Sequence, residues 1–371
     1  MITTALDIIL VVMLLFHSVL LIVTAYNYFT APRMNKPKIF SDQQAKVSIL
    51  IPARNEENNI ENCLNSVFNS DYNNYEVKVL NDLSTDLTEQ KVKAFQLKYR
   101  NLELLQGKEL PDGWTGKNWA CNQLAEKARG EFLLFLDADV IINPKAVQYA
   151  VAEIKDKKAH MLSIFPTQQI KSIGEWLIIP LMDWLLLTFL PLKKVYKSSN
   201  TAFAAANGQF MLFDKESYLL FGGHKKVKGK NVEDMEIARG FKQMRFKTIT
   251  LLGNNYVTCR MYHNIKEASD GFTKNFYPGF NINGIKFILL LSFFSFLFIL
   301  PFLLIYLESI FILIAGIIFI ERMFTSLLSR QRLWINILLY PPQMIILIII
   351  GIKSLIDNKR KNVYWKGRNI S

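Results

Sequence analysis

The 371-residue chain contains few of the residues that build disulfide frameworks and metal clusters. It has four histidines and three cysteines, Cys63, Cys121 and Cys259. The cysteines are odd in number, lie far apart and show none of the short spacings typical of a zinc site. The composition therefore argues against a disulfide-stapled fold and fits a reducing compartment.

The chain also lacks the motifs of nucleic-acid-binding proteins, although its formal net charge is +13. Neither a helix-turn-helix nor a stacked-aromatic pattern is present. The basic residues form no single patch, and many flank apolar runs, where membrane topology and anionic lipids explain them. We therefore expect no nucleic acid partner. The 51% hydrophobic content instead favours membrane segments.

No lysine or arginine precedes the first apolar run, residues 5–26, whereas Arg33, Lys36 and Lys38 follow it. A cleaved signal peptide has the opposite charge order. The run is long enough to cross a bilayer core of roughly 30 Å, and basic residues favour the cytoplasmic side. We predict an N-terminal membrane anchor over residues 1–30, with its N-terminus outside.

A second apolar region occupies the C-terminal segment 271–371. The spans predicted within it are 286–307, 309–326 and 333–352. Six lysines and arginines between residues 353 and 368 predict a cytoplasmic tail, which three full crossings would place outside. Since paired prolines break a helix, we predict that the segment with Pro341 and Pro342 is re-entrant or interfacial. An ordinary span with an outside tail is the alternative.

Residues 44–270 are charged and mixed, and strand patterns alternate with helix patterns. This alternation predicts an α/β domain with a mainly parallel sheet, and such sheets bind ligands at the carboxyl ends of their strands. Polar stretches follow three of the predicted strands, namely "PARNEE", "NDLSTD" and "DAD". Each alone is an ordinary turn, but three on one edge indicate a binding site.

Asp137 and Asp139 follow the buried strand "FLLFL", with only Ala138 between them. Two like charges this close cost free energy unless a positive group lies nearby. We therefore expect a positive group near the end of this strand.

In their order, "IPARNE", "NDLSTD", "GK..A.N", "LDAD" and a later "ED" before a helix resemble the inverting family 2 glycosyltransferases. The resemblance covers residues 46–270. It implies a GT-A fold, which is a nucleotide-diphospho-sugar transferase domain, here with N- and C-terminal transmembrane helices. The segments "PDGWTGKNWACNQ", "GGHK" and "YWKGR" are similar to those of bacterial membrane enzymes that glycosylate carotenoid acids or act in hopanoid pathways.

The resemblance also implies roles for residues at the sheet edge. The implied donor-binding residues are Pro52, Ala53, Arg54, Glu56, Asp82, Lys117, Asp137, Ala138 and Asp139. Among them, Asp82 would contact uracil, and Asp137 would lie at the ribose. Asp139, with Asp137, would bind Mg²⁺ or Mn²⁺, because hard oxygen ligands suit these ions and donor phosphates complete the shell. The cation would compensate the crowded carboxylates and stabilise the leaving diphosphate.

The stretch "NVEDMEIARGFKQ" supplies the remaining chemical group. The resemblance implies that Asp234 is the general base acting on an acceptor hydroxyl, with Glu233 as its supporting neighbour. The alternative is that both acids only complement the dipole of a helix start. Polymerising relatives carry Q-x-x-R-W after this helix, whereas this chain has "QMRF" at 243–246, which favours the addition of a single sugar.

The apolar segment 173–192 is predicted to lie as a helix in the membrane interface rather than to cross the bilayer. A crossing there would separate Asp139 from Asp234, although both must reach one donor sugar. At the interface, Asp183 would face water and avoid the cost of a charge within a span. A buried core helix is the alternative.

The apolar spans predict a lipid-type acceptor, such as a carotenoid or glycolipid, and the implied uracil contact predicts a UDP-hexose donor. A carboxylic acid with an ordinary pKa of ~4 is already ionised and needs no base, so the acid pair favours a hydroxyl acceptor. A catalytically inactive membrane binding protein and a polyprenyl-phosphate sugar transferase are the alternatives. We interpret His224 and His263 as structural or acceptor-side residues rather than metal ligands.

Overall fold

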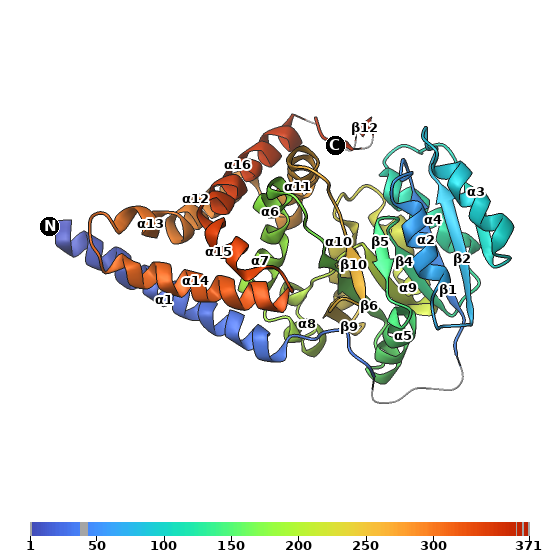
Figure 1. Ribbon diagram of the computed structural model, residues 1–371, viewed down its shortest axis with the longest axis horizontal. Coiled ribbons are helices and arrows are strands. Elements are labelled where there is room, and N and C mark those ends of the chain that lie inside the picture. The colour runs from blue at the N-terminus through green and yellow to red at the C-terminus, as the bar shows by residue number, and fades with distance from the viewer. Residues whose placement is uncertain (1, 38–43, 361, 366, 370–371) are drawn as a thin grey trace. The chain divides into compact units, whose positions relative to one another are not determined.

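The computed structural model describes residues 2–37, 44–360, 362–365 and 367–369. The chain divides into two compact units. Unit 1 comprises Met1–Ala31, Ile170–Leu192 and Tyr262–Ser371, and unit 2 comprises Pro32–Gln169 and Lys193–Met261. The predicted α/β sheet lies in unit 2 (Figure 1).

Unit 2 is built on a seven-stranded sheet with the order β3-β2-β1-β4-β8-β6-β9. Its strands are β1 (Val47–Ala53), β2 (Tyr75–Asn81), β3 (Leu102–Gln106), β4 (Phe132–Leu136), β6 (Met161–Phe165), β8 (Phe210–Asp214) and β9 (Thr248–Leu252). The first four strands in this order are parallel, β8 runs antiparallel to both β4 and β6, and β9 is parallel to β6. The mainly parallel sheet confirms the predicted architecture. A small second sheet contains β5 (Val140–Ile142), β10 (Val257–Cys259) and β7 (Thr167–Gln168).

Helices cover both faces of the large sheet because its central strands are apolar on both faces. They are α2 (Ile60–Phe68), α3 (Thr88–Lys98), α4 (Gly116–Lys127), α5 (Ala146–Asp156), α8 (Lys193–Lys197), α9 (Lys215–Phe221) and α10 (Glu233–Gln243), with the short 3₁₀ helices η1 (Thr201–Phe203) and η2 (Gly223–Val227). Side chains alternate along β1: Val47 and Ile49 belong to a core with α2 and α5, whereas Leu50 packs in a second core with α4 and α10. Burial on both sides fixes the register of the strands and the level at which they end.

Unit 1 is helical and apolar. Its elements are α1 (Ile2–Thr30), α6 (Ile173–Ile178), α7 (Pro180–Phe189), α11 (Ile265–Phe280), α12 (Gly284–Phe298), α13 (Leu300–Leu304), α14 (Phe311–Leu328), α15 (Leu333–Leu338) and α16 (Tyr340–Lys359), with the strands β11 (Tyr364–Trp365) and β12 (Arg368–Asn369). Within the described ranges, α1, α14 and α16 are long and apolar enough to cross a membrane. The pair α11 and α12 would count as a fourth span, but it is bent by 111°.

Two of the predicted spans are divided in the structure. The segment 286–307 forms α12 and α13, because Pro301 lies in the first turn of a new helix. The segment 333–352 contains α15 and most of α16, and Pro341 and Pro342 lie in the first turn of α16. Proline lacks an N–H group, and N–H groups in the first turn of a helix have no partner within that helix, so proline is tolerated at this position. The helix break expected at the proline pair is therefore present, because α15 ends at Leu338 and α16 begins at Tyr340. A re-entrant or interfacial placement of this segment stays a prediction. The side of the membrane on which the tail lies stays a prediction.

The segment 173–192 contains two helices, α6 and α7, rather than one, since Pro180 begins the second. Asp183 is only 3% exposed and accepts a hydrogen bond from Gln331 Nε2 at 2.7 Å. Trp184 is also buried. Because a buried carboxylate requires such a partner, the expectation that Asp183 faces water is wrong. The position of this segment relative to a membrane stays a prediction.

A buried polar network joins four helices of unit 1. Arg322 of α14 donates to Asn336 of α15 at 3.1 Å and to Gln343 of α16 at 2.6 Å. Asn336 donates in turn to Gln331 at 2.7 Å, and the amide of Gln331 reaches Asp183 of α7. Polar groups in apolar surroundings are costly when they lack partners. The network therefore favours one packing arrangement of α7, α14, α15 and α16.

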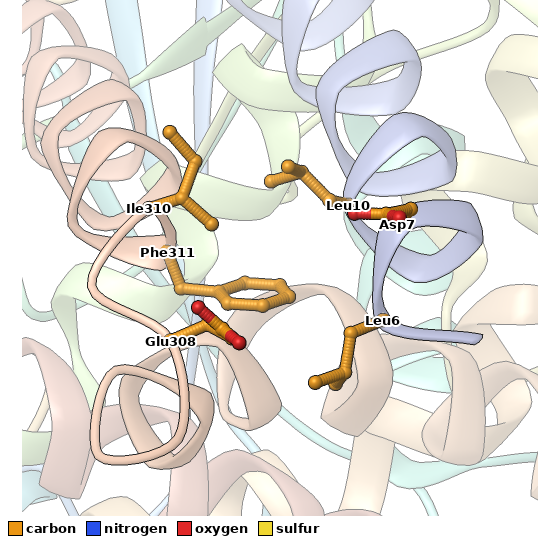
Figure 2. Close-up of a pocket in the computed structure, with 6 residues that line it drawn as sticks. All are labelled: Leu6, Asp7, Leu10, Glu308, Ile310 and Phe311. Atoms are coloured by element: carbon orange, nitrogen blue, oxygen red, sulfur yellow. The ribbon is translucent and has the colours of Figure 1, made fainter. Parts of the chain in front are cut away.

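A cavity of about 100 Å³ also lies in unit 1 (Figure 2). It is lined by Leu6, Asp7, Leu10, Glu308, Ile310 and Phe311. None of the predicted donor-binding or catalytic residues lines this cavity, and we assign it no role in the chemistry.

Candidate active site

The ends of β1 and β2 bring the first two polar stretches together. Ala53 lies opposite Asn81 in the register of these strands, so Arg54 and Asp82 follow at the same level. The Nη1 group of Arg54 donates to the carbonyl oxygens of Asp82 at 2.7 Å and Leu83 at 3.2 Å. The turn after β1 and the turn after β2 are therefore in direct contact.

Two residues with left-handed backbones shape these turns. Asn55 has a φ of 52° and Leu83 a φ of 54°. Leucine adopts this conformation at a cost of roughly 1–2 kcal/mol, whereas asparagine tolerates it. The N–H of Asn55 donates to Ser84 Oγ at 3.1 Å, and its Oδ1 accepts from the N–H of Thr85 at 2.9 Å. These cross-links hold the two turns against each other.

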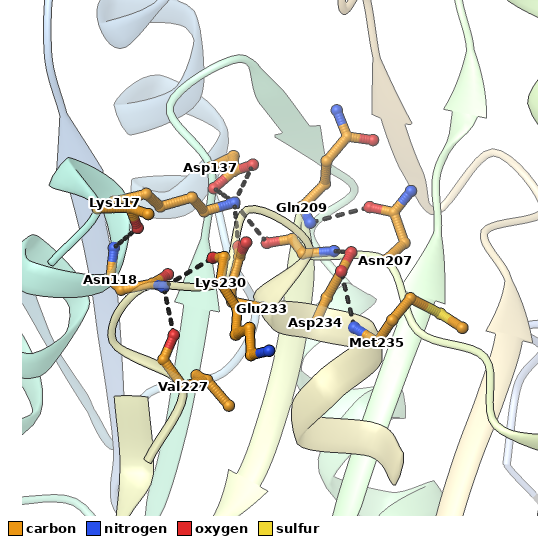
Figure 3. A network of polar contacts seen from close by, with 12 residues as sticks. Lys117, Asn118, Asp137, Asn207, Gln209, Val227, Lys230, Glu233, Asp234 and Met235 are labelled. Atoms are coloured by element: carbon orange, nitrogen blue, oxygen red, sulfur yellow. Dashed lines mark hydrogen bonds and ion pairs between the residues drawn. The ribbon is translucent and has the colours of Figure 1, made fainter. Parts of the chain in front are cut away.

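Lys117, in the first turn of α4, supplies a positive charge at the end of β4 (Figure 3). Its Nζ lies 2.9 Å from a carboxylate oxygen of Asp137 and 3.2 Å from Glu233 Oε1. It also donates to the carbonyl oxygen of Gly208 at 3.5 Å. One ammonium group thus joins the end of β4, the start of α10 and the turn before β8. We refer to Lys117, Asp137, Glu233 and Gly208 as the lysine hub.

Burial and charge act in opposite directions on the pKa values in the lysine hub. Burial raises the pKa of Asp137, and the ion pair with Lys117 opposes this rise. Burial would lower the pKa of Lys117, but the charges of Asp137 and Glu233 raise it well above its usual value. The ammonium group therefore stays protonated at neutral pH.

Asp234 lies at the edge of the lysine hub, in the first turn of α10. Its Oδ2 accepts a hydrogen bond from the N–H of Gly208 at 2.8 Å, and its Oδ1 accepts from the N–H of Met235 at 2.7 Å. Burial, followed by the charge of Glu233, raises the pKa of Asp234 to about 7. A carboxylate whose pKa lies near the working pH is well suited to take a proton from a hydroxyl group.

Asp139 lies next to two buried thiols. The pKa values of Cys63 and Cys259 are raised, chiefly by burial and next by the charge of Asp139. The charges of Glu56 and Asp137 also act on Cys63. Glu56, Asp137 and Asp139 thus all lie near enough to the Cys63 thiol for their charges to act on it.

The remaining predicted donor residues surround this group. Ala53 and Ala138 are buried, and the carbonyl oxygen of Ala53 accepts from the N–H of Asp82 at 2.8 Å. Pro52 is half-buried in β1. Asp82 is buried, and its charge helps to raise the pKa of the Cys121 thiol, after the larger effect of burial. All of these residues lie at the carboxyl end of the parallel strands.

The two histidines have other partners. His224 is buried against Phe135, with ring centroids 4.7 Å apart, and its Nδ1 shares a hydrogen bond with the Tyr218 hydroxyl at 2.7 Å. Burial lowers the pKa of His224 to about 4, so its ring is neutral at pH 7. His263 is largely exposed, and its Nδ1 lies 3.6 Å from Glu267.

Two residues that the sequence analysis did not single out belong to this site. One is Gly208, in the lysine hub. The other is Asn118, whose buried Nδ2 donates to the carbonyl oxygens of Val227, Lys228 and Lys230 at 2.9, 3.2 and 3.0 Å. Asn118 thereby holds the loop that leads into α10. The available signal for Gly208 was the short polar run "NGQ" between apolar residues, which is also typical of an ordinary turn.

Residues 48–218 match the protein family described as Glycosyl transferase family 2. The 4,4'-diaponeurosporenoate glycosyltransferase of Staphylococcus haemolyticus (strain JCSC1435) is 25% identical over 236 residues, which are 63% of this chain and 61% of that protein. The enzyme of the same name from Staphylococcus aureus (strain USA300) is 26% identical over 250 residues, 66% of this chain and 64% of that protein. The chain thus spans less than two thirds of the length of these relatives.

Among solved structures, a mannosyltransferase from Pyrobaculum calidifontis in complex with GDP-Man and Mn²⁺ has a TM-score of 0.57 to this chain. The two are 18% identical, and the similarity covers 97% of this chain and 99% of the other. At this identity the similarity describes the fold. Together, the two findings show a GT-A-like fold with a domain similar to glycosyltransferase family 2 over residues 48–218.

Proposed function

We propose that this protein is a membrane-bound inverting glycosyltransferase that moves one sugar from a nucleotide-sugar donor to a lipid-type acceptor. The single observation that carries the proposal is the lysine hub, in which Asp137 and Glu233 share the ammonium group of Lys117. Through this contact, the predicted donor end of β4 and the predicted base helix α10 belong to one charged cluster.

The donor is a nucleoside diphosphate sugar, with UDP-hexose as the specific proposal. The turn residues Arg54 and Glu56 and the buried Asp82 would line its nucleotide pocket, with Asp137 at the ribose. The contact between Arg54 and the Asp82 carbonyl supports this placement, because it fixes the two turns on either side of such a pocket. The Pyrobaculum mannosyltransferase has a GDP-sugar bound, so a direct comparison of UDP-sugars with GDP-sugars tests which nucleobase this protein selects.

A divalent cation, Mg²⁺ or Mn²⁺, would be held by Asp139 and Asp137. Within the ranges that the structure describes, no three His, Cys, Asp or Glu side chains are grouped to hold a metal ion. Mg²⁺ is commonly held by one or two carboxylates together with substrate phosphates, so this pair fits an ion that arrives with the donor. Such an ion neutralises charge on the departing nucleoside diphosphate.

Asp234 is the proposed general base, and Glu233 is its neighbour within the lysine hub. Two N–H groups hold the Asp234 carboxylate in place, and its pKa of about 7 keeps it able to accept a proton. The acceptor hydroxyl would lose its proton to this carboxylate while its oxygen attacks the anomeric carbon from the side opposite the diphosphate, which inverts the configuration.

The acceptor is proposed to be an apolar molecule with a hydroxyl group, such as a carotenoid or glycolipid. The apolar helices α1, α14 and α16 support a multi-pass membrane protein. The basic residues that follow the first apolar run support a cytoplasmic position for unit 2. The two staphylococcal relatives are named for transfer to a carotenoid acid, 4,4'-diaponeurosporenoate. An ionised carboxylic acid needs no base. Transfer to a hydroxyl acceptor would therefore require Asp234, whereas transfer to a carotenoid acid would not.

The proposal is tested with the full chain in lipid nanodiscs, a panel of nucleotide sugars, and Mn²⁺ or EDTA. Hydroxylated carotenoid, carotenoid acid, glycolipid and polyprenyl phosphate are offered as separate acceptors, and products are identified by mass spectrometry. Transfer of a single hexose to a lipid supports the proposal. Binding of donor without any transfer would identify an inactive binding protein instead, and a polyprenyl-phosphate product would change the acceptor class.

Transfer to a hydroxyl acceptor should slow as the pH falls below about 7. Only the ionised form of Asp234 accepts a proton, and burial raises its pKa to about 7, so each further pH unit should cost about tenfold in rate. Single-turnover rates measured from about pH 5 to about pH 8, on both sides of this pKa, test the expected decrease. A flat profile for the hydroxyl acceptor would show that Asp234 does not act as the base.

A further inference from the structure

The turn from Asn207 to Gln209 lies between Lys117 and Asp234 and contacts both (Figure 3). The N–H of Gly208 donates to Asp234 Oδ2 at 2.8 Å, and its carbonyl oxygen accepts from Lys117 Nζ at 3.5 Å. The main chain of one residue therefore contacts both the carboxylate and the ammonium group.

Gly208 also leaves the space in which these groups meet. A Cβ atom at this position would lie 3.0 Å from Lys117 Nζ, 3.1 Å from Glu233 Oε1 and 3.5 Å from Asp234 Oδ2. The first two distances are shorter than ordinary van der Waals contacts, so a side chain here would displace the ammonium group or the Glu233 carboxylate. Glycine is required for this close approach and not for a left-handed backbone.

Buried hydrogen bonds hold the turn in place. Ser163 of β6 accepts from the N–H of Asn207 at 2.8 Å, and its hydroxyl donates to the Asn207 carbonyl at 3.1 Å. The Asn207 side chain accepts from the N–H of Gln209 at 2.9 Å, and the Gln209 carbonyl accepts from the N–H of Asp137 at 3.0 Å. Side chains of β6 and the main chain after β4 therefore fix the direction of the Gly208 peptide.

We propose that Gly208 is a positioning residue of the transfer reaction, which orients the Asp234 carboxylate through its N–H and keeps Lys117 between Asp137 and Glu233 by having no side chain. Ser163 acts behind it by holding the peptide. The inference rests on the proposed glycosyltransferase function, because it assigns roles around the proposed base.

The test compares Gly208→Ala with Gly279→Ala, a matched control at which an added Cβ would meet nothing within 4 Å. Two quantities are measured on the full chain in nanodiscs. The first is kcat for sugar transfer. The second is the rate at which an amine-reactive reagent acetylates Lys117, which mass spectrometry follows. The melting temperature of each variant is recorded as a check on folding.

Gly208→Ala should lower kcat by about tenfold, less than the roughly 100-fold cost of misplacement by about 1 Å, because Lys117 or Glu233 must shift by a few tenths of an ångström. Acetylation of Lys117 should become measurably faster, because its amine is no longer held between Asp137 and Glu233. Ser163→Ala should change both quantities in the same direction but less, because Asn207 and Gln209 still tether the turn. Gly279→Ala should match the unmodified protein.

Equal acetylation of Lys117 in Gly208→Ala and Gly279→Ala would overturn the proposal, whatever the transfer rates. An unchanged kcat in Gly208→Ala would overturn it as well. Absence of transfer in every variant and in the unmodified protein would contradict the proposed function, and the acetylation rates would still decide whether Gly208 holds Lys117 in place.

Discussion

Asp234→Asn should lose transfer to a hydroxyl acceptor by roughly two to four orders of magnitude while it still binds UDP. Asparagine has nearly the same shape, and its amide oxygen can still accept from the N–H of Gly208 or Met235, but it cannot take a proton. The protein should therefore fold and bind donor normally. Single-turnover transfer and calorimetric UDP binding measure the two effects separately.

Glu236→Gln is a suitable control for this variant because Glu236 lies on the same helix and pairs with Arg239. It should retain nearly full transfer activity. Near-normal turnover in Asp234→Asn would remove Asp234 from the mechanism. Loss of transfer to a hydroxyl but not to a carotenoid acid would show that the base matters only for the acceptor that must be deprotonated.

Removal of divalent cations should weaken UDP binding by more than about 100-fold, beyond the effect expected for an outer-shell partner of a metal. The diphosphate would otherwise face the carboxylates of Asp137 and Asp139, and the positive charge of Lys117 is already shared between Asp137 and Glu233. Calorimetry with UDP in EDTA and in Mn²⁺ measures the difference. Equal affinity for UDP in the two solutions would contradict the assignment of a divalent cation to Asp137 and Asp139.

Asp139→Asn should reproduce the effect of EDTA in the presence of Mn²⁺, without a large change in melting temperature. Asp71→Asn provides the control, because Asp71 pairs with Lys145 at the surface through contacts unrelated to the donor. If the two variants bind UDP equally well, Asp139 is not a ligand of the cation.

Much of unit 2 could be predicted because its signals are local. Each strand is a short apolar run that ends in polar residues, and the order of these runs predicts parallel strands with their carboxyl ends at one edge. Asp82, Asp137 and Asp139 were found at such ends. The sequence therefore predicted which residues come together at the edge of the sheet.

The contacts within the site could not be predicted, because they depend on packing between distant segments. Lys117 and Glu233 are far apart in the sequence, and no sequence pattern indicates that they pair. The close approach of their side chains to Gly208 forms only when α4 and α10 have packed on the sheet. In unit 1, the burial of Asp183 depends on Gln331, a polar residue with no periodic signal. The proline pair at 341–342 predicted a break in its segment but not the 20-residue helix that begins there, because a helix start and a helix break share the same residues.

With α14 crossing the membrane as proposed, its neighbouring charges have a consequence for the order in which the protein is assembled in a bilayer. Glu321 pairs with His17 of α1 at 3.1 Å, a partner synthesised much earlier, whereas Arg322 depends on Asn336 and other residues synthesised later. An unpaired arginine at the centre of a span costs about +2.5 to +3.5 kcal/mol during insertion. A nascent chain ending at residue 330 should therefore leave α14 less completely inserted than the full chain does. Glycosylation mapping of the loop before α14 measures this directly, and equal insertion of both chains would show that the later helices are not needed.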